Sequence, residues 1–288
     1  MDKPGGMTSH DVVGRLRQIT GERSIGHLGT LDPMATGVLP LLMGKYTRLA
    51  QYFSAAEKSY SGTIRFGFAT DTYDAEGTAA GPDLRPQLTL DAVRAAAARF
   101  QGEMEQLPPP FSAKKIEGKP AYKLAREGRP VELRAARIRI LSFVIARAEG
   151  PEADFTITVS AGGYVRSVAH EMGQALGCGA YLSRLRRTRA GAFAIEEAHT
   201  LDELETLKGN IEELAARCAH PRGLLPEMPA VTADAQTLGR LRNGAQANLP
   251  EFSDAAMVKV FADQRELAGI AKRIAGTLFQ PAVIFGGQ

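Results

Sequence analysis

The chain has 288 residues, of which 44% are hydrophobic and 23% are charged, and its formal net charge is +3. This length suits one large domain or a large and a small one, and the composition is typical of a folded protein. No apolar run approaches the ~20 residues that cross a bilayer, no secretion signal is present, and Cys178 and Cys218 have no metal-ligand spacing. We therefore expect a reduced, cytoplasmic protein with no membrane span and no metal site.

Helices and strands are predicted along the first two thirds of the chain from the spacing of apolar residues. Helical spacing with capping residues predicts helices from Thr8 or Ser9 to about Gly21, from Thr89 to about Gln101, and from Tyr164 to Leu176. The later part of 41–53 is also expected to be helical. Alternation predicts strands over 58–68, within 131–147 and around 155–159. Because these elements do not form regular βαβ units, we expect an α+β domain around a largely antiparallel central sheet, flanked by helices and loops.

A domain boundary is predicted where two prolines, Pro226 and Pro229, follow a helix that starts near Thr200. The remainder contains a short predicted helix over 235–242 and β-like runs over 257–262 and 282–285. Fewer than sixty residues suffice only for a small barrel. The sequence therefore predicts one domain over residues 1–226 and a small, β-rich domain over 230–288.

Charge is distributed unevenly along the chain. Nine basic residues lie between Lys114 and Arg139 against three acidic ones, and a second basic cluster comprises Arg184, Arg186, Arg187 and Arg189. The helix after Thr200 is acidic instead. This asymmetry favours an anionic ligand over a uniformly solvated surface.

The stretch 26–40, GHLGTLDPMATGVLP, contains a single acidic side chain, Asp32. Pro33 favours an extended conformation at Asp32, and the surrounding glycines permit tight turns, so the carboxylate is expected on a stiff loop against the core. A carboxylate held in this way suggests a nucleophile or a general base. On spacing alone, an Asx-turn in which Asp32 only caps the chain reversal is an equal alternative.

This stretch closely resembles the signature of the TruB family of tRNA pseudouridine synthases, GHTGTLDPLATGVLP. Further matches follow in order at 2–9 (DKPGGMTS), 58–60 (KSY), 163–166 (GYVR) and 185–187 (LRR), over roughly two thirds of the chain. The resemblance implies a pseudouridine synthase fold, a PUA-type RNA-binding domain at the C-terminus, and conversion of uridine 55 in the tRNA T loop to pseudouridine. Family members usually have a strand before the Asp-Lys-Pro-Gly segment, which here is missing or reduced to Met1.

The resemblance also implies roles for individual residues. It makes Asp32 the catalytic aspartate, with Arg166 as the cation that lowers its pKa. Tyr60 would stack on the uracil, Tyr164 would be a second active-site tyrosine, and Leu185 would close the pocket. From the residues alone, the alternatives are a surface helix charge for Arg166, a core side chain for Tyr60, which its spacing favours, and packing at a helix start for Tyr164.

Three further positions match the family at lower specificity. His27 would help to replace the flipped base in the RNA stack, although a lone loop histidine is more often a local hydrogen-bonding group. Asp74 would orient the arginine network. Lys3 belongs to the Lys-Pro motif, where a structural role beside the catalytic loop and an RNA contact are equally plausible.

The implied chemistry needs no cofactor and no metal, because no electron leaves the substrate when the uracil is rotated and reattached. The expected partner is the T-arm stem-loop of tRNA, bound by a monomer, with the target base flipped out. A Walker motif fails at 37–45, because six residues separate the glycines and Tyr46 follows Lys45. A zinc motif at His170 fails because Gln174 stands where a histidine is required. A non-catalytic RNA-binding protein on the same scaffold and a synthase for another RNA remain as alternatives.

Overall fold

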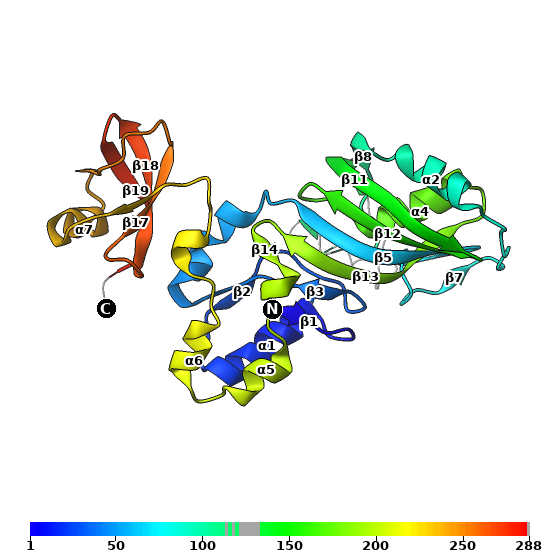
Figure 1. The fold of residues 1–288 in the computed structure, drawn as a ribbon, viewed down its shortest axis with the longest axis horizontal. Coiled ribbons are helices and arrows are strands. Elements are labelled where there is room, and N and C mark those ends of the chain that lie inside the picture. The colour runs from blue at the N-terminus through cyan, green and yellow to red at the C-terminus, as the bar shows by residue number, and fades with distance from the viewer. Residues whose placement is uncertain (113–114, 117–118, 121–132, 287–288) are drawn as a thin grey trace. The chain divides into compact units, whose positions relative to one another are not determined.

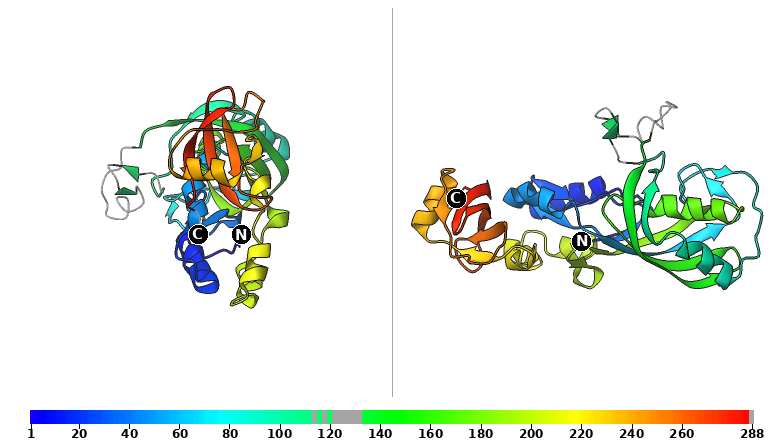
Figure 2. Two further views of the ribbon diagram at one scale, coloured as in Figure 1. Left: turned by 90° about the vertical axis from the view of Figure 1, so that its left-hand side faces the viewer. Right: turned by 90° about the horizontal axis from the view of Figure 1, so that it is seen from above.

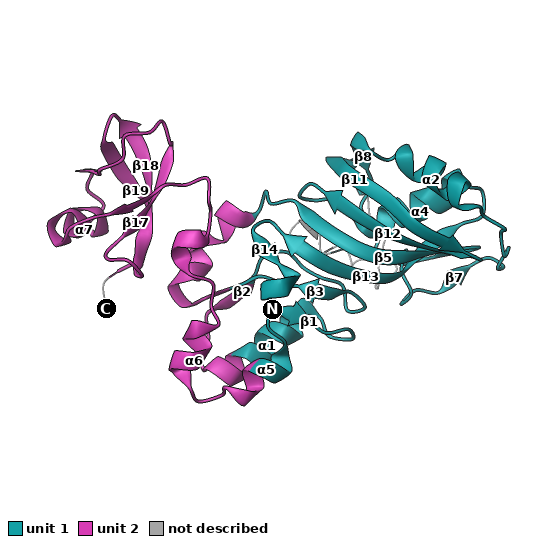
Figure 3. Ribbon diagram, in the orientation of Figure 1, with its two compact units in different colours: residues 1–16, 27–41, 54–203 teal, residues 17–26, 42–53, 204–288 magenta. Residues whose placement is uncertain are grey.

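The structure is a computed structural model that describes residues 1–112, 115–116, 119–120 and 133–286. It divides into two compact units (Figure 3), one of residues 1–16, 27–41 and 54–203 and the other of residues 17–26, 42–53 and 204–288. The boundary expected at 226–230 stays a prediction, since the second unit also takes in two earlier segments. Several members of the expected basic cluster lie outside the described residues: Lys114, Lys123, Arg126 and Arg129.

The first unit is built on an eight-stranded sheet with the strand order β1-β3-β13-β5-β12-β11-β8 and with β14 paired to β13 (Figure 1). Only the β3–β13 pair is parallel in this sheet. This confirms the prediction of an α+β fold around a largely antiparallel sheet. The strands are β1 (Asp2–Lys3), β3 (Thr36–Val38), β5 (Lys58–Phe66), β8 (Gly102–Gln106), β11 (Ala136–Glu149), β12 (Glu152–Val159), β13 (Ala180–Ala190) and β14 (Phe193–Ala194).

Two helices, α2 (Leu90–Ala98) and α4 (Val165–Ala175), lie side by side against this sheet (Figures 1 and 2). The prediction for α2 is confirmed at its start, where the Thr89 hydroxyl accepts a hydrogen bond from the Ala92 N–H at 3.2 Å. Helix α4 packs closely on β13 at Gly173. A Cβ at this position would lie only 2.2 Å from the Ala180 nitrogen, so the close approach requires glycine. The core therefore lies between these helices and the inner face of the sheet.

Strand β13 is central to the sheet, although no strand is predicted from its sequence. Two register shifts interrupt its pairing with β5, between Leu182 and Arg184 and between Arg187 and Arg189. Each shift inserts one extra residue, so the buried side chains follow one another at uneven intervals and not at every second position. The bulges keep one set of residues on the inner face: Leu182, Leu185, Arg187 and Ala190.

The remaining predictions for this part of the chain hold with local differences. Helix α1 (Ser9–Thr20) is confirmed, whereas 41–53 forms a short strand, β4 (Leu41–Met43), followed by a 3-10 helix, η1 (Gly44–Phe53). An N-terminal edge strand is present and consists of Asp2 and Lys3, which pair with Val38 and Gly37. The short elements are β2 (Ile25–His27), which pairs with β4, then β6 (Ala69–Thr70), β7 (Ala79–Ala80), β9 (Lys115–Ile116), β10 (Lys119–Pro120) and η2 (Ile195–Glu197).

The second unit contains a five-stranded sheet with the order β15-β17-β18-β19-β16. The predicted helix 235–242 is α7 (Ala235–Arg242), which starts where the Asp234 carboxylate accepts a hydrogen bond from the Thr237 N–H at 2.7 Å. The acidic helix after Thr200 is two short helices, α5 (Leu201–Thr206) and α6 (Ile211–Ala216). The other elements are η3 (Pro221–Gly223), β15 (Ala230–Thr232), β16 (Ala247–Asn248), β17 (Met257–Phe261), β18 (Leu267–Ala275) and β19 (Leu278–Ile284).

Candidate active site

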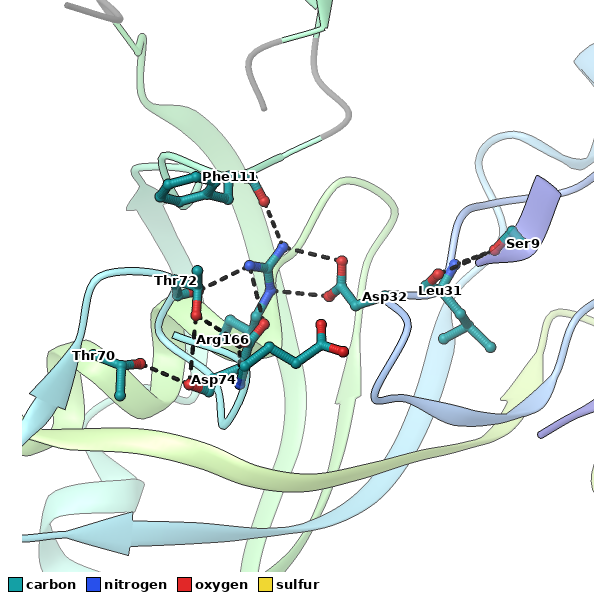
Figure 4. A network of polar contacts seen from close by, with 9 residues as sticks. Ser9, Leu31, Asp32, Thr70, Thr72, Asp74, Phe111 and Arg166 are labelled. Atoms are coloured by element: carbon teal, nitrogen blue, oxygen red, sulfur yellow. Dashed lines mark hydrogen bonds and ion pairs between the residues drawn. The ribbon is translucent and has the colours of Figure 1, made fainter. Parts of the chain in front are cut away.

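The loop that contains Asp32 is anchored on both sides of this residue. The Ser9 hydroxyl accepts a hydrogen bond from the Leu31 N–H at 2.8 Å and donates one to the Leu31 carbonyl at 3.1 Å (Figure 4). On the other side, the Pro33 carbonyl accepts hydrogen bonds from the Gly6 N–H at 2.8 Å and from Lys3 Nζ at 3.1 Å. The backbone around Asp32 is therefore fixed before any ligand binds.

The carboxylate of Asp32 faces the guanidinium of Arg166, which lies in the first turn of α4 (Figure 4). Arg166 Nε lies 2.9 Å from Asp32 Oδ2, and Arg166 Nη2 donates a hydrogen bond to Asp32 Oδ1 at 3.1 Å. The Arg166 side chain is 5% exposed and that of Asp32 is 34% exposed. Arg166 thus orients the Asp32 carboxylate from one side, and the other side of the carboxylate is accessible from outside the protein. Both carboxylate oxygens engage Arg166, so the side chain of Asp32 does more than cap a chain reversal.

Arg166 is itself held by three further groups (Figure 4). Its guanidinium donates hydrogen bonds to the carbonyls of Thr72 and Phe111, each at 2.8 Å, and its Nη1 lies 3.3 Å from Asp74 Oδ2. The Asp74 side chain is 3% exposed, and its Oδ1 accepts hydrogen bonds from the Thr72 hydroxyl at 2.6 Å and from the Glu76 N–H at 3.1 Å. A planar guanidinium with this many fixed partners has one orientation, and it imposes that orientation on Asp32.

Arg166 acts on the pKa of Asp32 in the expected, downward direction, but a larger effect outweighs it. Burial raises the pKa of Asp32 above its ordinary value of 3.8, because the charged form loses hydration. Arg166 opposes this shift, whereas the nearby charge of Asp74 adds to it. The net direction is upward. Asp32 is therefore a more basic carboxylate than a solvated one, which suits a group that must accept a proton or attack an electrophile.

Tyr60 lies on the inner face of β5 and is 8% exposed. Its pKa is raised by burial, and a hydrogen bond to the Arg187 guanidinium together with the charge of Arg187 partly opposes that shift. Arg187 is 1% exposed, and it also donates hydrogen bonds to the Val38 carbonyl at 2.6 Å and the Gly29 carbonyl at 3.0 Å. Arg187 thus links Tyr60 to both ends of the Asp32 loop, a role that its place in a run of basic residues does not indicate.

The other predicted site residues occupy defined positions in the same unit. Tyr164 caps the start of α4, where its N–H donates a hydrogen bond to Gln106 Oε1 at 2.7 Å; burial raises the pKa of its phenol, and the charges of Arg166 and Asp32 also act on it. Leu185 is buried on the inner face of β13. His27 ends β2, and burial together with the charge of Arg187 lowers its pKa. The structure therefore brings Asp32 and Asp74 into direct contact with Arg166, and the charge of Asp32 also acts on Tyr60 and Tyr164.

The four arginines of the predicted basic cluster on β13 have different surroundings, and their binding to an anion stays a prediction. Arg187 is buried, Arg186 Nη2 forms an ion pair with Asp2 at 2.7 Å, and Arg184 Nη2 lies 3.6 Å from Asp154. The register of the strand directs Arg187 to the inner face, whereas Arg184, Arg186 and Arg189 lie on the other face. Lys3 is also buried, and its Nζ donates hydrogen bonds to the carbonyls of Pro4, Met7 and Pro33, which favours the structural alternative for Lys3.

Within the described residues, we find no group of three or more His, Cys, Asp or Glu side chains arranged to hold a metal ion. None of the helices in the described ranges has the length and apolar character needed to cross a membrane.

Comparisons with known proteins agree with this geometry. Residues 17–165 match the family model of the N-terminal domain of TruB family pseudouridylate synthases, and residues 166–222 match that of the tRNA pseudouridylate synthase B C-terminal domain. The chain is 41% identical to tRNA pseudouridine synthase B of Solibacter usitatus over 99% of this chain and 98% of that protein. It is 47% identical to the synthase of the same name from Opitutus terrae over 72% of this chain and 86% of that protein.

A solved structure of a Cbf5-Nop10-Gar1 complex contains a chain with a similar fold. The TM-score is 0.69 at 27% identity, over 96% of this chain and 78% of that one. A structure of an H/ACA RNP bound to a substrate RNA containing 2'-deoxyuridine has a TM-score of 0.72 at 24% identity, over 99% of this chain and 84% of that one. The fold, the motif around Asp32 and the full-length relatives agree, and the chain belongs to the TruB family of pseudouridylate synthases.

Proposed function

We propose that the protein is a tRNA pseudouridine synthase that isomerises uridine 55 of the T loop, with Asp32 as its catalytic aspartate. The observation that carries the proposal is the Asp32 carboxylate, held through both oxygens by Arg166 while one third of the side chain stays exposed. Full-length relatives named tRNA pseudouridine synthase B at 38% to 41% identity support the reaction and the substrate class.

The reaction breaks the bond between N1 of the uracil and C1′ of the ribose and forms a bond between C5 and C1′, while C5 loses its proton and N1 gains one. A carboxylate is needed beside the sugar and the base at the moment the base detaches. Asp32 supplies this group, and its raised pKa makes it a stronger base and nucleophile than a solvated aspartate. Arg166 and Asp74 fix its direction, so little reorganisation is needed during the reaction.

The target base must leave the stack of the T loop to reach Asp32. We assign Tyr60 to stacking on the flipped uracil, Tyr164 and Leu185 to the pocket wall, and His27 to the vacated place in the RNA stack. The small β-rich sheet of the second unit is assigned, as a PUA-like domain, to RNA binding. Because tRNA is the proposed substrate, we also propose that the protein is cytoplasmic and that it acts as a monomer.

The proposal is tested with a T-arm stem-loop that carries tritium at C5 of uridine 55. Release of tritium by the wild-type protein, together with pseudouridine at that position, is expected. Tight binding of the stem-loop without release would favour the non-catalytic RNA-binding alternative. Release from a ribosomal RNA fragment but not from the stem-loop would favour a synthase for another RNA.

The pH dependence of the reaction should reflect the raised pKa of Asp32. Because the ionised form is needed, activity is lost as pH falls through the pKa, so the acid limb of kcat/KM should lie above pH 3.8. The variant Asp74→Asn removes a negative neighbour that raises this pKa, and its acid limb should therefore move to lower pH. Rates measured at fixed ionic strength across the acid range test both statements, and a shift to higher pH in Asp74→Asn would contradict them.

Two substitutions of Tyr60 should distinguish its contribution to the stability of the fold from its contribution to stem-loop binding. Tyr60→Phe removes the hydroxyl that hydrogen-bonds the buried Arg187, so we expect a loss of about 1 to 3 kcal/mol in the free energy of unfolding with stem-loop affinity retained. Tyr60→Ala should in addition weaken stem-loop binding by ~1 to 3 kcal/mol, because the stacking face is lost. Circular dichroism in denaturant is the suitable stability measurement, since the chain has no tryptophan. Equal affinities of the two variants would exclude stacking.

A further inference from the structure

Tyr73 has an unusual backbone conformation at the centre of the loop that holds Arg166. Its φ is +65°, and only two other non-glycine residues in the described ranges, Arg85 and Leu225, have positive φ. The left-handed region is unfavourable for a bulky side chain, because Cβ comes too close to the following carbonyl oxygen. Such a conformation persists only where neighbouring contacts impose it.

The strained residue determines how the loop meets Arg166. The Thr72 carbonyl accepts a hydrogen bond from Arg166 at 2.8 Å, and Asp74 Oδ2 lies 3.3 Å from the same guanidinium. Between them, the Tyr73 carbonyl points the other way and accepts a hydrogen bond from the Leu182 N–H at 3.0 Å. A change of φ at residue 73 turns the Thr72–Tyr73 peptide relative to the chain that follows. The Thr72 and Asp74 oxygens would then no longer both face Arg166.

The side chain of Tyr73 stacks on His170. The two ring centroids are 3.7 Å apart and the planes are inclined by only 12°. His170 follows Arg166 by four residues on α4, so both side chains leave the same face of the helix. A contact of 3.1 Å between Gln174 Nε2 and His170 Nε2 holds the imidazole from the next turn. Helix α4 therefore contacts the loop at two points, through the guanidinium of Arg166 and through the ring of His170, which stacks on Tyr73.

We propose that Tyr73 and His170 are positioning residues that keep the loop 72–74 in its strained conformation, and thereby orient Arg166 and Asp32 for catalysis. The expected effect on the rate rests on the proposed function. The contacts of Tyr73 and His170 with the loop do not depend on that function. Neither ring touches Asp32 through a hydrogen bond or ion pair in the described structure. The two side chains take no direct part in the chemical step. They affect its rate through the direction of the Asp32 carboxylate.

Four variants test the pair by single-turnover kinetics and stem-loop affinity. Tyr73→Ala and His170→Ala should each lower the rate at saturating RNA by on the order of tenfold, with the dissociation constant changed less than about threefold, because a misdirected catalytic group affects the rate and not ground-state binding. Tyr73→Phe keeps the ring and should stay within about twofold of wild type. Tyr73→Gly should retain more activity than Tyr73→Ala, because glycine adopts φ +65° without strain.

Coupling and controls distinguish positioning from general destabilisation. The double variant Tyr73→Ala/His170→Ala should be no slower than the slower single variant, because the two rings act as one unit. Tyr181→Ala is the matched control: it removes a half-buried tyrosine paired with Phe68 at 5.1 Å and should keep the wild-type rate. Wild-type rates in both alanine variants would overturn the proposal, and so would a loss fully additive in the double variant.

A crystal structure of Tyr73→Ala separates this inference from the proposed function. We expect the Thr72 carbonyl to have moved out of hydrogen-bonding distance of Arg166, whatever RNA the protein modifies. An unchanged loop with the Thr72 carbonyl still bound to Arg166 would overturn the inference even if the protein is a synthase. Absence of pseudouridine formation by the wild type, with the loop displaced in the variant, would instead count against the proposed function alone.

Discussion

Asp32→Asn is expected to lower the rate of pseudouridine formation by at least about 10⁴-fold, which corresponds to roughly 5 kcal/mol of activation free energy. The amide has the size of the carboxylate, but it can neither attack an electrophile nor accept a proton at neutral pH. The anchors of the loop at Ser9, Lys3 and Gly6 do not involve the Asp32 side chain, so the fold should persist. Tritium release from the C5-labelled stem-loop measures the rate, and fluorescence anisotropy measures binding.

The stem-loop affinity of Asp32→Asn decides whether its lower rate reflects a loss of catalysis or a loss of binding. The stem-loop affinity should be equal to or greater than that of the wild type, because removal of a negative charge reduces repulsion of the phosphates. Asp71→Asn is a suitable control: Asp71 is an exposed carboxylate whose Oδ1 accepts a hydrogen bond from the Thr78 N–H at 2.7 Å, and its loss should leave the rate unchanged. If affinity fell in proportion to the rate, Asp32 would be a binding residue and not a catalytic one.

Arg166→Met is expected to have the largest effect on stability. The substitution fills much of the volume of the arginine but leaves the buried Asp74 without its cation, and removal of one partner from a buried ion pair typically costs about 3 to 5 kcal/mol. It also releases Asp32 and two backbone carbonyls, those of Thr72 and Phe111. We expect a loss of this size in the free energy of unfolding and a rate reduced by at least about 100-fold, measured by denaturant titration and single-turnover kinetics.

A second substitution distinguishes the charge of Arg166 from its packing. Asp74→Asn in the Arg166→Met background removes the stranded charge, so part of the stability should return while the rate stays low. Arg166→Lys keeps a positive charge but offers no planar fork that reaches both Asp32 oxygens, so it should be more stable than Arg166→Met and still slow. Full activity in Arg166→Lys would show that charge alone is sufficient at this position.

Much of the fold could be predicted from the sequence where one period holds over a whole element. The helices α1, α2 and α7 and the strand β5 have regular apolar spacing, and they are found close to their predicted places. Strand β13 has no such regularity, because two bulges break its alternation and four arginines dominate its composition. Arg187 shows the difficulty most clearly. Its charge predicts exposure, yet carbonyls and the Tyr60 hydroxyl satisfy it inside the protein.

The candidate site could be predicted only in part, for a similar reason. Asp32 and Arg166 are 134 residues apart, and no local pattern brings them together; the family motifs supplied that pairing. The pKa of Asp32 depends on how much water the fold removes from around the carboxylate, which a sequence does not contain. Tyr73 reads as part of an ordinary loop, because a positive φ at a tyrosine has no signature in composition.

The two bulges of β13 also bear on how this strand can change length in evolution. The extra residue at each bulge lies at Ser183 and at Thr188, between stretches that pair regularly with β5. Loss of either residue would restore simple alternation and leave the neighbouring side chains on the same faces. Loss of Arg186, which lies between the bulges, would instead turn Leu185 or Arg187 outward. Insertions and deletions in the TruB family should therefore concentrate at these two positions, while the segment between them keeps a constant length.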